Sequence, residues 1–236
     1  MTDRIIEAGG YKWIIRPESE INGKLQDELG SDDREAEIVL QVRELGDPDG
    51  EFIDIGACVG GFSIRAAKHF KRVFAFEPNS FNRKGLEINK HLNDLENIEV
   101  MHHALGEEEV DQCVSVKGGG SKVYENEEDA PSAYGIETVC VEPLDNFNQM
   151  FTNVKLIKID TEGHELPILK GAEHIIKTYE PVLLIETHEN TYKNDPKLKN
   201  QYENILMLMG EYGYHVEEMG RTGFGDYHLI CYPKTV

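Results

Sequence analysis

The sequence predicts an α/β fold in which a mostly parallel sheet carries helices on both faces. From residue 51 onwards, short apolar segments typical of strands alternate with segments that have the apolar periodicity of helices. A glycine-rich turn at residues 56–61 follows the first of these strands, and the acidic residue Glu77 ends the second. Strand, helix and strand repeated in this way are typical of a parallel sheet that is covered on both sides. The length of 236 residues suits one such domain.

The lead-in at residues 1–30 is expected to form a hairpin or cap, with residues 11–15 as its strand-like part. A capped helix begins at Ser31 and ends at the turn formed by residues 46–50. Strands are then expected at residues 51–55, 72–76, 98–102, 138–142, 156–160 and 181–186, and helices at residues 62–70, 83–92, 165–178 and 202–212. Residues 214–217 and 227–231 form a closing antiparallel pair. We therefore expect a single domain over residues 31–236.

A polar stretch interrupts this alternation around residues 107–137. It contains three consecutive glycines at residues 118–120 and an acidic run at residues 125–129. We interpret it as an insertion that either covers a functional site or forms a surface loop.

The charge of the chain is strongly acidic, with 44 Asp and Glu against 24 Lys and Arg and a net charge of −20. Proteins that bind nucleic acid or an anionic membrane need basic residues for the phosphates, so both partners are disfavoured. The four cysteines lie far apart without a C-x-x-C pair, which disfavours a zinc site or a disulfide framework. Because the first residues lack the pattern of a signal peptide and no apolar stretch could span a bilayer, we expect a soluble, cytoplasmic protein.

The turn after the strand at residues 51–55 is the most informative segment. Its candidate cofactor-binding residues are Asp54, Gly56, Ala57, Cys58, Gly60 and Phe62. Glycines let a ligand approach the backbone, and ligands of open α/β sheets lie at the carboxyl ends of the strands. A dinucleotide fingerprint would have glycine at position 58, and the G-K-[ST] of a phosphate-binding loop is absent. The acidic strand end therefore favours a cationic sulfonium cofactor, S-adenosylmethionine (SAM), although an ordinary strand-to-helix turn has the same glycines.

The ends of the next two strands offer further cofactor contacts. Glu77, followed by Pro78 and Asn79, ends the second strand, where a carboxylate can accept hydrogen bonds from both ribose hydroxyls of a nucleotide. A solvated turn acid or a helix cap is the alternative role for Glu77. His103 and Ala104 follow the third strand and are expected to lie near the adenine.

With these segments, the chain resembles the FkbM family of SAM-dependent methyltransferases from about Phe52 to Glu186. The likeness rests on residues 52–57, 76–78, 104–106 and 144–145, and above all on residues 157–165 (IKIDTEGHE) and 169–172 (LKGA). The resemblance implies a Rossmann-like class I methyltransferase sheet of seven strands with an antiparallel C-terminal strand. It also implies O-methylation of a hydroxyl on a sugar or another small metabolite. The family usually has Asn where this chain has Cys58.

Transfer of a methyl group to a hydroxyl requires that the acceptor is positioned and that its proton is removed. The catalytic candidates follow the strands at residues 156–160 and 181–186, and they are Asp160, Glu162, His164 and His188. The two histidines are the candidate general bases because histidine titrates near neutral pH. Asp160 is also a candidate cofactor contact. In a less favoured alternative, Asp160 and Glu186 bind Mg²⁺, by analogy with metal-dependent O-methyltransferases. Helix capping and solubility are the simplest roles for the same side chains.

Three other functions stay open at this point. One is a nicotinamide-dependent oxidoreductase on a similar fold, which the missing glycine at position 58 disfavours. Another is a non-catalytic module that keeps the fold for regulation or assembly. The third is a methyltransferase whose acceptor is a protein or a nucleic acid. We expect a hydroxyl-bearing small molecule or sugar as the acceptor, and neither nucleic acid nor a membrane as a partner.

Overall fold

The computed structural model describes residues 3–15, 41–116, 123–124, 127–129, 135–188, 198, 200–221 and 227–234. Of the expected first helix, only the helical residues 41–44 belong to this part of the chain. The expected boundary between a lead-in and the main domain, near residue 30, lies outside the described residues and stays a prediction.

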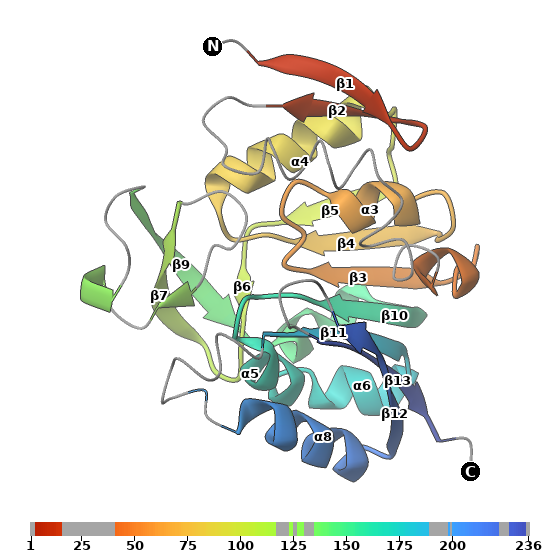
Figure 1. Ribbon diagram of the computed structural model, residues 1–236, viewed down its shortest axis with the longest axis vertical. Helices are drawn as coiled ribbons and strands as arrows, with labels where there is room; N and C mark the ends of the chain where they lie inside the picture. Colours follow the sequence, from red (N-terminus) through yellow and green to blue (C-terminus); the bar gives the residue numbers. More distant parts are fainter. Residues whose placement is uncertain are drawn as a thin grey trace.

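A seven-stranded sheet forms the centre of the molecule (Figure 1). Its strands are, in spatial order, β12 (Tyr214–Arg221), β13 (Tyr227–Pro233), β11 (Val182–Thr187), β10 (Val154–Ile159), β3 (Glu51–Ile55), β4 (Arg72–Phe76) and β5 (Ile98–Met101). The five strands from β11 to β5 are parallel, whereas β13 is antiparallel to both β11 and β12. The expected Rossmann-like sheet, mostly parallel with an antiparallel C-terminal strand, is confirmed.

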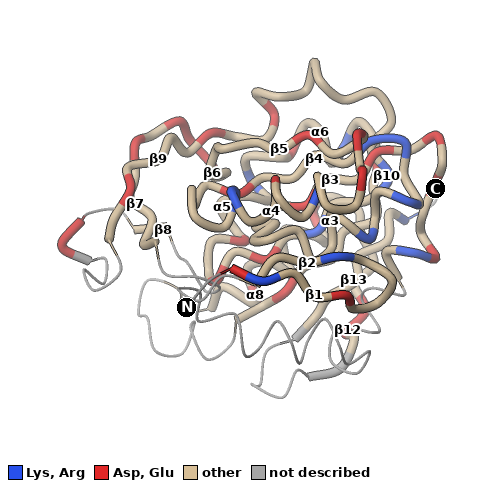
Figure 2. Tube along the Cα trace, turned by 90° about the horizontal axis from the view of Figure 1, so that it is seen from above, with Lys and Arg blue, Asp and Glu red and all other residues tan. Residues whose placement is uncertain are grey.

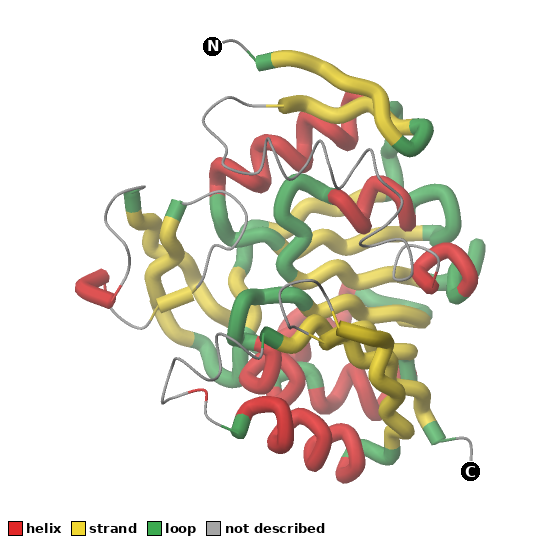
Figure 3. The backbone as a smooth tube through the Cα atoms, viewed as in Figure 1, coloured by secondary structure: helices red, strands yellow, loops and turns green. Residues whose placement is uncertain are grey.

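Each face of this sheet has its own apolar core, because successive residues of a strand point to opposite faces. The helices that cover the faces are α3 (Gly61–Ala66), α4 (Ser80–Leu92), α5 (Glu165–Lys170), α6 (Glu173–Tyr179) and α8 (Gln201–Glu211). Ile53 and Phe74 belong to the core beneath α5, α6 and α8, and Phe52 and Val73 to the core beneath α3 and α4. Helices therefore cover both faces, as expected (Figure 3). None of the helices in the described part of the chain is long and apolar enough to span a membrane.

The described lead-in is an antiparallel hairpin formed by β1 (Arg4–Ala8) and β2 (Tyr11–Ile15). It packs on α4, because the N–H groups of Lys12 and Ile14 donate to side-chain oxygens of Asn93 (2.9 Å) and Asn89 (2.8 Å). Trp13, between them, is fully buried. The hairpin therefore completes the core on the α3 and α4 face.

The stretch interpreted as an insertion forms two strands that the sequence did not predict, at residues 110–115 and 123–124, whereas the strand expected at residues 138–142 is present as part of a longer one. β7 (Val110–Ser115), β8 (Val123–Tyr124), β9 (Ile136–Glu142) and β6 (Ala104–Leu105) make a second sheet in the order β6-β9-β7-β8. Two 3₁₀ helices accompany it, η1 (Glu127–Asp129) and η3 (Leu144–Met150). β7 escaped prediction because its first residues are exposed and its last three are all buried, which breaks the alternation typical of a strand.

The single helix expected at residues 165–178 is two helices, α5 and α6, separated at Gly171 and Ala172. Gly171 packs directly on another backbone segment: a Cβ atom there would come within 1.9 Å of the Gly106 carbonyl oxygen. The Gly171 carbonyl also accepts a hydrogen bond from the N–H of Asp145 (3.0 Å). This tertiary contact ends α5, and the periodicity of the sequence does not reveal it.

Two other helices differ from expectation at one end. α3 ends at Ala66 rather than at residue 70. α4 begins at Ser80 rather than at residue 83, because the side chain of Asn79 accepts hydrogen bonds from the N–H groups of Phe81 and Asn82 and so caps the helix.

Replacing Gly171 by alanine is expected to lower the free energy of unfolding by about 2 kcal/mol, because the added methyl group forces two packed backbone segments apart. Gly210, inside α8, is the matched control, since a Cβ atom there would meet no atom within 4 Å. Gly210→Ala should raise the free energy of unfolding by about 0.5–1 kcal/mol, the usual helix preference of alanine over glycine. Chemical denaturation measures both effects. Equal changes in the two variants would contradict the close contact at Gly171.

Candidate active site

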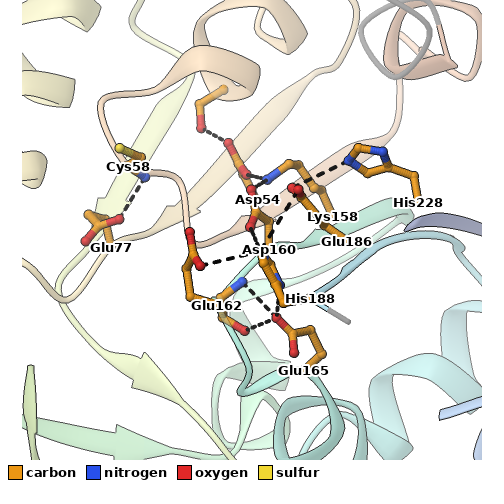
Figure 4. A network of polar contacts seen from close by, with 12 residues as sticks. Asp54, Cys58, Glu77, Lys158, Asp160, Glu162, Glu165, Glu186, His188 and His228 are labelled. Carbon is orange, nitrogen blue, oxygen red and sulfur yellow. Dashed lines mark hydrogen bonds and ion pairs between the residues drawn. The ribbon is translucent and has the colours of Figure 1, made fainter. Parts of the chain in front are cut away.

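The predicted site residues meet at the carboxyl edge of the parallel strands (Figure 4). Cys58 lies in the glycine-rich loop after β3, and Glu77 directly follows β4. Asp160 directly follows β10, and His188 directly follows β11. Four segments that are far apart in the sequence therefore contribute to one region.

Gly56 fixes the glycine-rich loop against the loop after β10. Its φ of 78° lies in the left-handed region, and a Cβ atom would come within 1.8 Å of the Asp160 carbonyl oxygen. The N–H groups of Gly56 and Ala57 both donate to the Phe76 carbonyl, at 3.0 Å each. Gly60, with a φ of 91°, then precedes α3. Glycine at position 56 is therefore required by a close backbone approach, beyond what an ordinary turn needs.

Cys58 has a φ of 52°, in the left-handed region that asparagine adopts more readily than most residues. This conformation suits the asparagine that the resemblance to the FkbM family leads one to expect at this position. The contact that Cys58 makes here comes from its backbone, because its N–H donates to Glu77 Oε2 at 2.7 Å. The departure from the family pattern therefore leaves this hydrogen bond in place.

Glu77 is a buried carboxylate whose two oxygens are both set by the backbone. Oε2 accepts from the N–H of Cys58 (2.7 Å) and Oε1 from the N–H of Asn79 (2.9 Å). Burial raises the pKa of Glu77 to about 7. The carbonyl of Pro78 accepts from the Arg83 guanidinium at 2.8 Å, and the Asn79 side chain caps α4. The cofactor contacts that the sequence suggested for Glu77, Pro78 and Asn79 stay predictions.

Asp54 and Lys158 form a buried pair beneath the loop. One Asp54 oxygen accepts from the Ser63 hydroxyl, and the other lies 3.9 Å from Lys158 Nζ without a hydrogen-bond partner among the described residues. Burial outweighs Lys158 and raises the pKa of Asp54. Lys158 Nζ also lies 3.1 Å from Asp160 Oδ2 and 4.5 Å from the centre of the Phe62 ring. Asp54 is fully buried, and the cofactor contact that the sequence suggested for it stays a prediction.

His188 lies at the centre of four carboxylates, and we call these five residues the His188 cluster. Its Nδ1 lies 3.2 Å from Glu165 Oε1, and its Nε2 lies 3.6 Å from Asp160 Oδ1, 3.7 Å from Glu162 Oε2 and 4.0 Å from Glu186 Oε1. The structure therefore brings together Asp160, Glu162 and His188 of the predicted catalytic residues.

The carboxylates control the charge of His188. Burial alone would lower the pKa of His188, but the hydrogen bond and the charge of Glu165, with the charges of Asp160 and Glu162, raise it to about 10. His188 is therefore protonated at neutral pH. This protonation does not favour the general-base role that the sequence suggested for it.

Asp160 and Glu186 share a hydrogen bond, and their environments push their pKa values apart. Burial and the charge of Asp160 raise the pKa of Glu186. Burial would raise the pKa of Asp160 as well, but Lys158 and His188 outweigh it and lower that pKa. Asp160 therefore stays ionised to lower pH, and Glu186 is the first of the two to take up a proton as the pH falls.

Glu165 holds the loop after β10 against His188. It is fully buried and accepts from the N–H groups of Thr161 (3.2 Å) and Gly163 (3.0 Å) and from Gln201 Nε2 (3.0 Å). The sequence did not predict Gln201 as a site residue, because its contact depends on how α8 packs. Lys158 was also missed, although a lysine between two buried isoleucines of a strand was an available signal.

His164 and His103 border the second sheet. His164 precedes α5, and its Nε2 lies 3.1 Å from the position that a Cβ atom on Gly106 would take. His103 Nε2 lies 3.4 Å from Glu142 Oε1, and its ring centre lies 5.0 Å from that of Phe147. Ala104 is buried in β6. The roles suggested for these three residues stay predictions.

Known proteins resemble this chain in sequence and in fold. The family model of the methyltransferase FkbM domain matches residues 54–216. Among solved structures, the methyltransferase FkbM from Methylobacillus flagellatus KT is 22% identical with a TM-score of 0.55, and the match covers 78% of this chain and 44% of that chain. The chain thus spans less than half the length of that protein. No curated protein matches the sequence significantly.

Two further solved structures share the fold at low identity. TYW2 from M. jannaschii, in complex with AdoMet, is 14% identical with a TM-score of 0.50, and the match covers 98% of this chain and 84% of that chain. SMU.1697c from Streptococcus mutans, in complex with SAH, is 12% identical with a TM-score of 0.53, and the match covers 84% of this chain and 97% of that chain. Because the family model matches well over half of its residues, the chain belongs to the methyltransferase FkbM domain family.

Proposed function

We propose that the chain is a SAM-dependent methyltransferase that methylates a hydroxyl group of a sugar or another small metabolite. The observation that carries the proposal is Glu77, a buried carboxylate fixed by the N–H groups of Cys58 and Asn79 beside the glycine-rich loop. A carboxylate held at this edge of the sheet can accept hydrogen bonds from both ribose hydroxyls. AdoMet and SAH, bound by proteins of the same fold, support this cofactor.

The charges around the loop suit a cationic cofactor. Asp54, Asp160 and Glu162 lie near its start and beneath it, and Lys158 is the cation that contacts Asp54 and Asp160. A sulfonium and an amino group would lower the repulsion among these carboxylates, whereas the pyrophosphate of a nicotinamide dinucleotide would increase it. SAM therefore fits these residues better than NAD does.

When bound, SAM would supply an electrophilic methyl group for the acceptor oxygen, and the electron pair of the broken S–C bond would stay on the sulfur of the demethylated product. The proton of the acceptor hydroxyl goes to Glu186, because its raised pKa makes it the stronger base of its pair with Asp160. His188, protonated and hydrogen-bonded to Glu165, holds the carboxylates together. Glu162, whose side chain is 33% exposed, is the most accessible carboxylate of the cluster and positions the acceptor.

The transfer proposed here is independent of a metal ion. Asp160, Glu186 and His188 have potential ligand atoms within 4.8 Å of one another, a spacing that would also suit a divalent cation. However, Lys158, 3.1 Å from Asp160, and the protonated His188 already balance these carboxylates. A histidine nitrogen is also a poor ligand for Mg²⁺.

Isothermal titration calorimetry with SAM, with its demethylated product and with NAD tests the proposed cofactor. We expect SAM and the product to bind and NAD not to bind, because the carboxylates of the site repel a pyrophosphate. Binding of NAD alone would favour an oxidoreductase. Binding of none of the three would favour a non-catalytic module, and either result would overturn the proposal.

A further inference from the structure

The N-terminal hairpin is held by asparagine side chains of α4. The N–H of Lys12 donates to Asn93 Oδ1 (2.9 Å), and the N–H of Ile14 donates to Asn89 Oδ1 (2.8 Å). The carbonyl of Lys12 accepts in turn from Asn93 Nδ2 at 2.8 Å. Figure 2 shows, as Figure 1 does, that β2 lies alongside α4. Because a hairpin of two strands is only marginally stable by itself, its order depends on these contacts.

Asn89 extends this contact to the glycine-rich loop. Its side chain is fully buried, and while Oδ1 accepts from Ile14, Nδ2 donates to the carbonyl of Val59 at 2.9 Å. α4 also packs closely on this residue, since a Cβ atom on Gly85 would lie 3.1 Å from Val59 Cγ1. A buried amide inside a helix is unfavourable unless it is hydrogen-bonded. Asn89 meets this requirement by bridging the hairpin and the loop.

Val59 lies in the most constrained part of the loop. Its neighbours Cys58 and Gly60 both have a φ in the left-handed region, 52° and 91°. A residue other than glycine keeps such a conformation only where the surrounding contacts hold it. The N–H of Cys58 is held on one side by Glu77, at 2.7 Å. The bond from Asn89 to the next residue holds the loop on the other side.

A second contact connects the hairpin to the end of the same loop. Trp13 of β2 is fully buried, and the Arg65 guanidinium lies 5.3 Å from the centre of its ring. Arg65 Nη1 donates to the carbonyl of Gly61, the first residue of α3, at 2.6 Å. The hairpin therefore reaches Val59 through Asn89 and Gly61 through Arg65. Two independent contacts place it in support of the loop.

We propose that Asn89 is a positioning residue for SAM: oriented by the N-terminal hairpin, it holds the carbonyl of Val59 and so keeps the glycine-rich loop in the conformation that binds the cofactor. The same conformation presents the N–H of Cys58 to Glu77. This inference rests on the proposed function, because it places SAM at the loop. It goes beyond that function by giving the hairpin and a residue in the middle of α4 a role in cofactor binding.

Calorimetric titration with SAM and urea unfolding of the same samples test this role in the wild type, Asn89→Ala and Asn93→Ala. Asn93 is the matched control, because it bonds Lys12 and the backbone of Asn89 but makes no hydrogen bond to the loop within the described part of the chain. Both variants should unfold at lower urea concentration than the wild type. Asn89→Ala should raise the Kd for SAM about tenfold or more, whereas Asn93→Ala should leave it within about twofold. A purely structural role would make the loss of affinity follow the loss of stability in both variants.

A wild-type Kd for SAM in Asn89→Ala would overturn the inference, as would an equal loss of affinity in Asn89→Ala and Asn93→Ala. Either result would leave SAM dependence intact. Failure of the wild type to bind SAM would instead overturn the proposed function, and the inference with it. Asn89→Ser keeps the test valid if Asn89→Ala does not fold. Its hydroxyl is too short to bond both partners, so this variant should also weaken SAM.

Discussion

Replacing Glu186 by glutamine is expected to lower kcat by about 10²–10⁴-fold while the affinity for SAM stays within about threefold. The amide occupies the space of the carboxyl group but cannot take a proton. Asp160, the other member of the pair, is a poor substitute, because Lys158 and His188 lower its pKa despite its burial. His188 is no substitute either, since it is already protonated at neutral pH. The loss should therefore appear in turnover and leave cofactor binding almost intact.

The pH profile distinguishes this role from a structural one. Because the pKa of Glu186 is raised, wild-type activity should fall as the pH drops through that pKa, where the side chain becomes a neutral acid. Glu186→Gln should lose this acidic limb along with most of its activity. Glu217→Gln is the matched control, since Glu217 is 55% exposed on β12, and its kcat and pH profile should be those of the wild type.

Two outcomes would contradict the role of Glu186. Turnover at the wild-type rate in Glu186→Gln would show that this carboxyl group takes no part in the proton transfer. Loss of wild-type activity on dialysis against EDTA, with recovery on addition of Mg²⁺, would make Asp160 and Glu186 metal ligands instead, as the less favoured alternative predicts. Activity that survives EDTA is the result expected from the ammonium of Lys158 and the protonated His188.

The main sheet and the position of the site could be predicted from the sequence, because both depend on local patterns. Apolar runs such as residues 73–76 are followed directly by an acidic residue, and parallel strands bring these ends to one edge. Glu77 and Asp160 were placed at this edge for this reason, and the structure has them there. The charge state of His188 could not be predicted, because it depends on Glu165, Asp160 and Glu162 together in three dimensions.

The second sheet and the break at Gly171 show a different limit. β7 buries its last residues against β9 and the start of α4, so its burial follows its partners rather than a period of two. Gly171 ends α5 because the backbone of Gly106 occupies the space of a side chain. Both features come from contacts between segments far apart in the sequence, and local sequence patterns do not predict such contacts.

The affinity for SAM is expected to rise between about pH 6 and pH 8. Burial raises the pKa of Glu77 to about 7, so its side chain is a neutral acid below this pH and a carboxylate above it. The carboxylate accepts the N–H groups of Cys58 and Asn79 and the side chain of Asn82 and can still accept from the ribose hydroxyls, whereas the neutral acid has lost part of this capacity. Two hydrogen bonds to a charged acceptor contribute about 3 kcal/mol, so Glu77→Ala should weaken SAM about 100-fold or more at high pH. Calorimetric titration across this range measures both effects.

Glu77→Gln separates the charge of this residue from its size. The amide can accept one of the two backbone N–H bonds, so the variant should fold and bind SAM weakly at every pH, without the rise through pH 7. Glu99→Gln, an exposed position on the neighbouring strand β5, should follow the wild type. The demethylated product keeps the ribose but lacks the sulfonium charge, so its affinity should rise with pH as that of SAM does. A rise seen with SAM alone would come instead from the carboxylates of the His188 cluster, and it would contradict the ribose contact at Glu77.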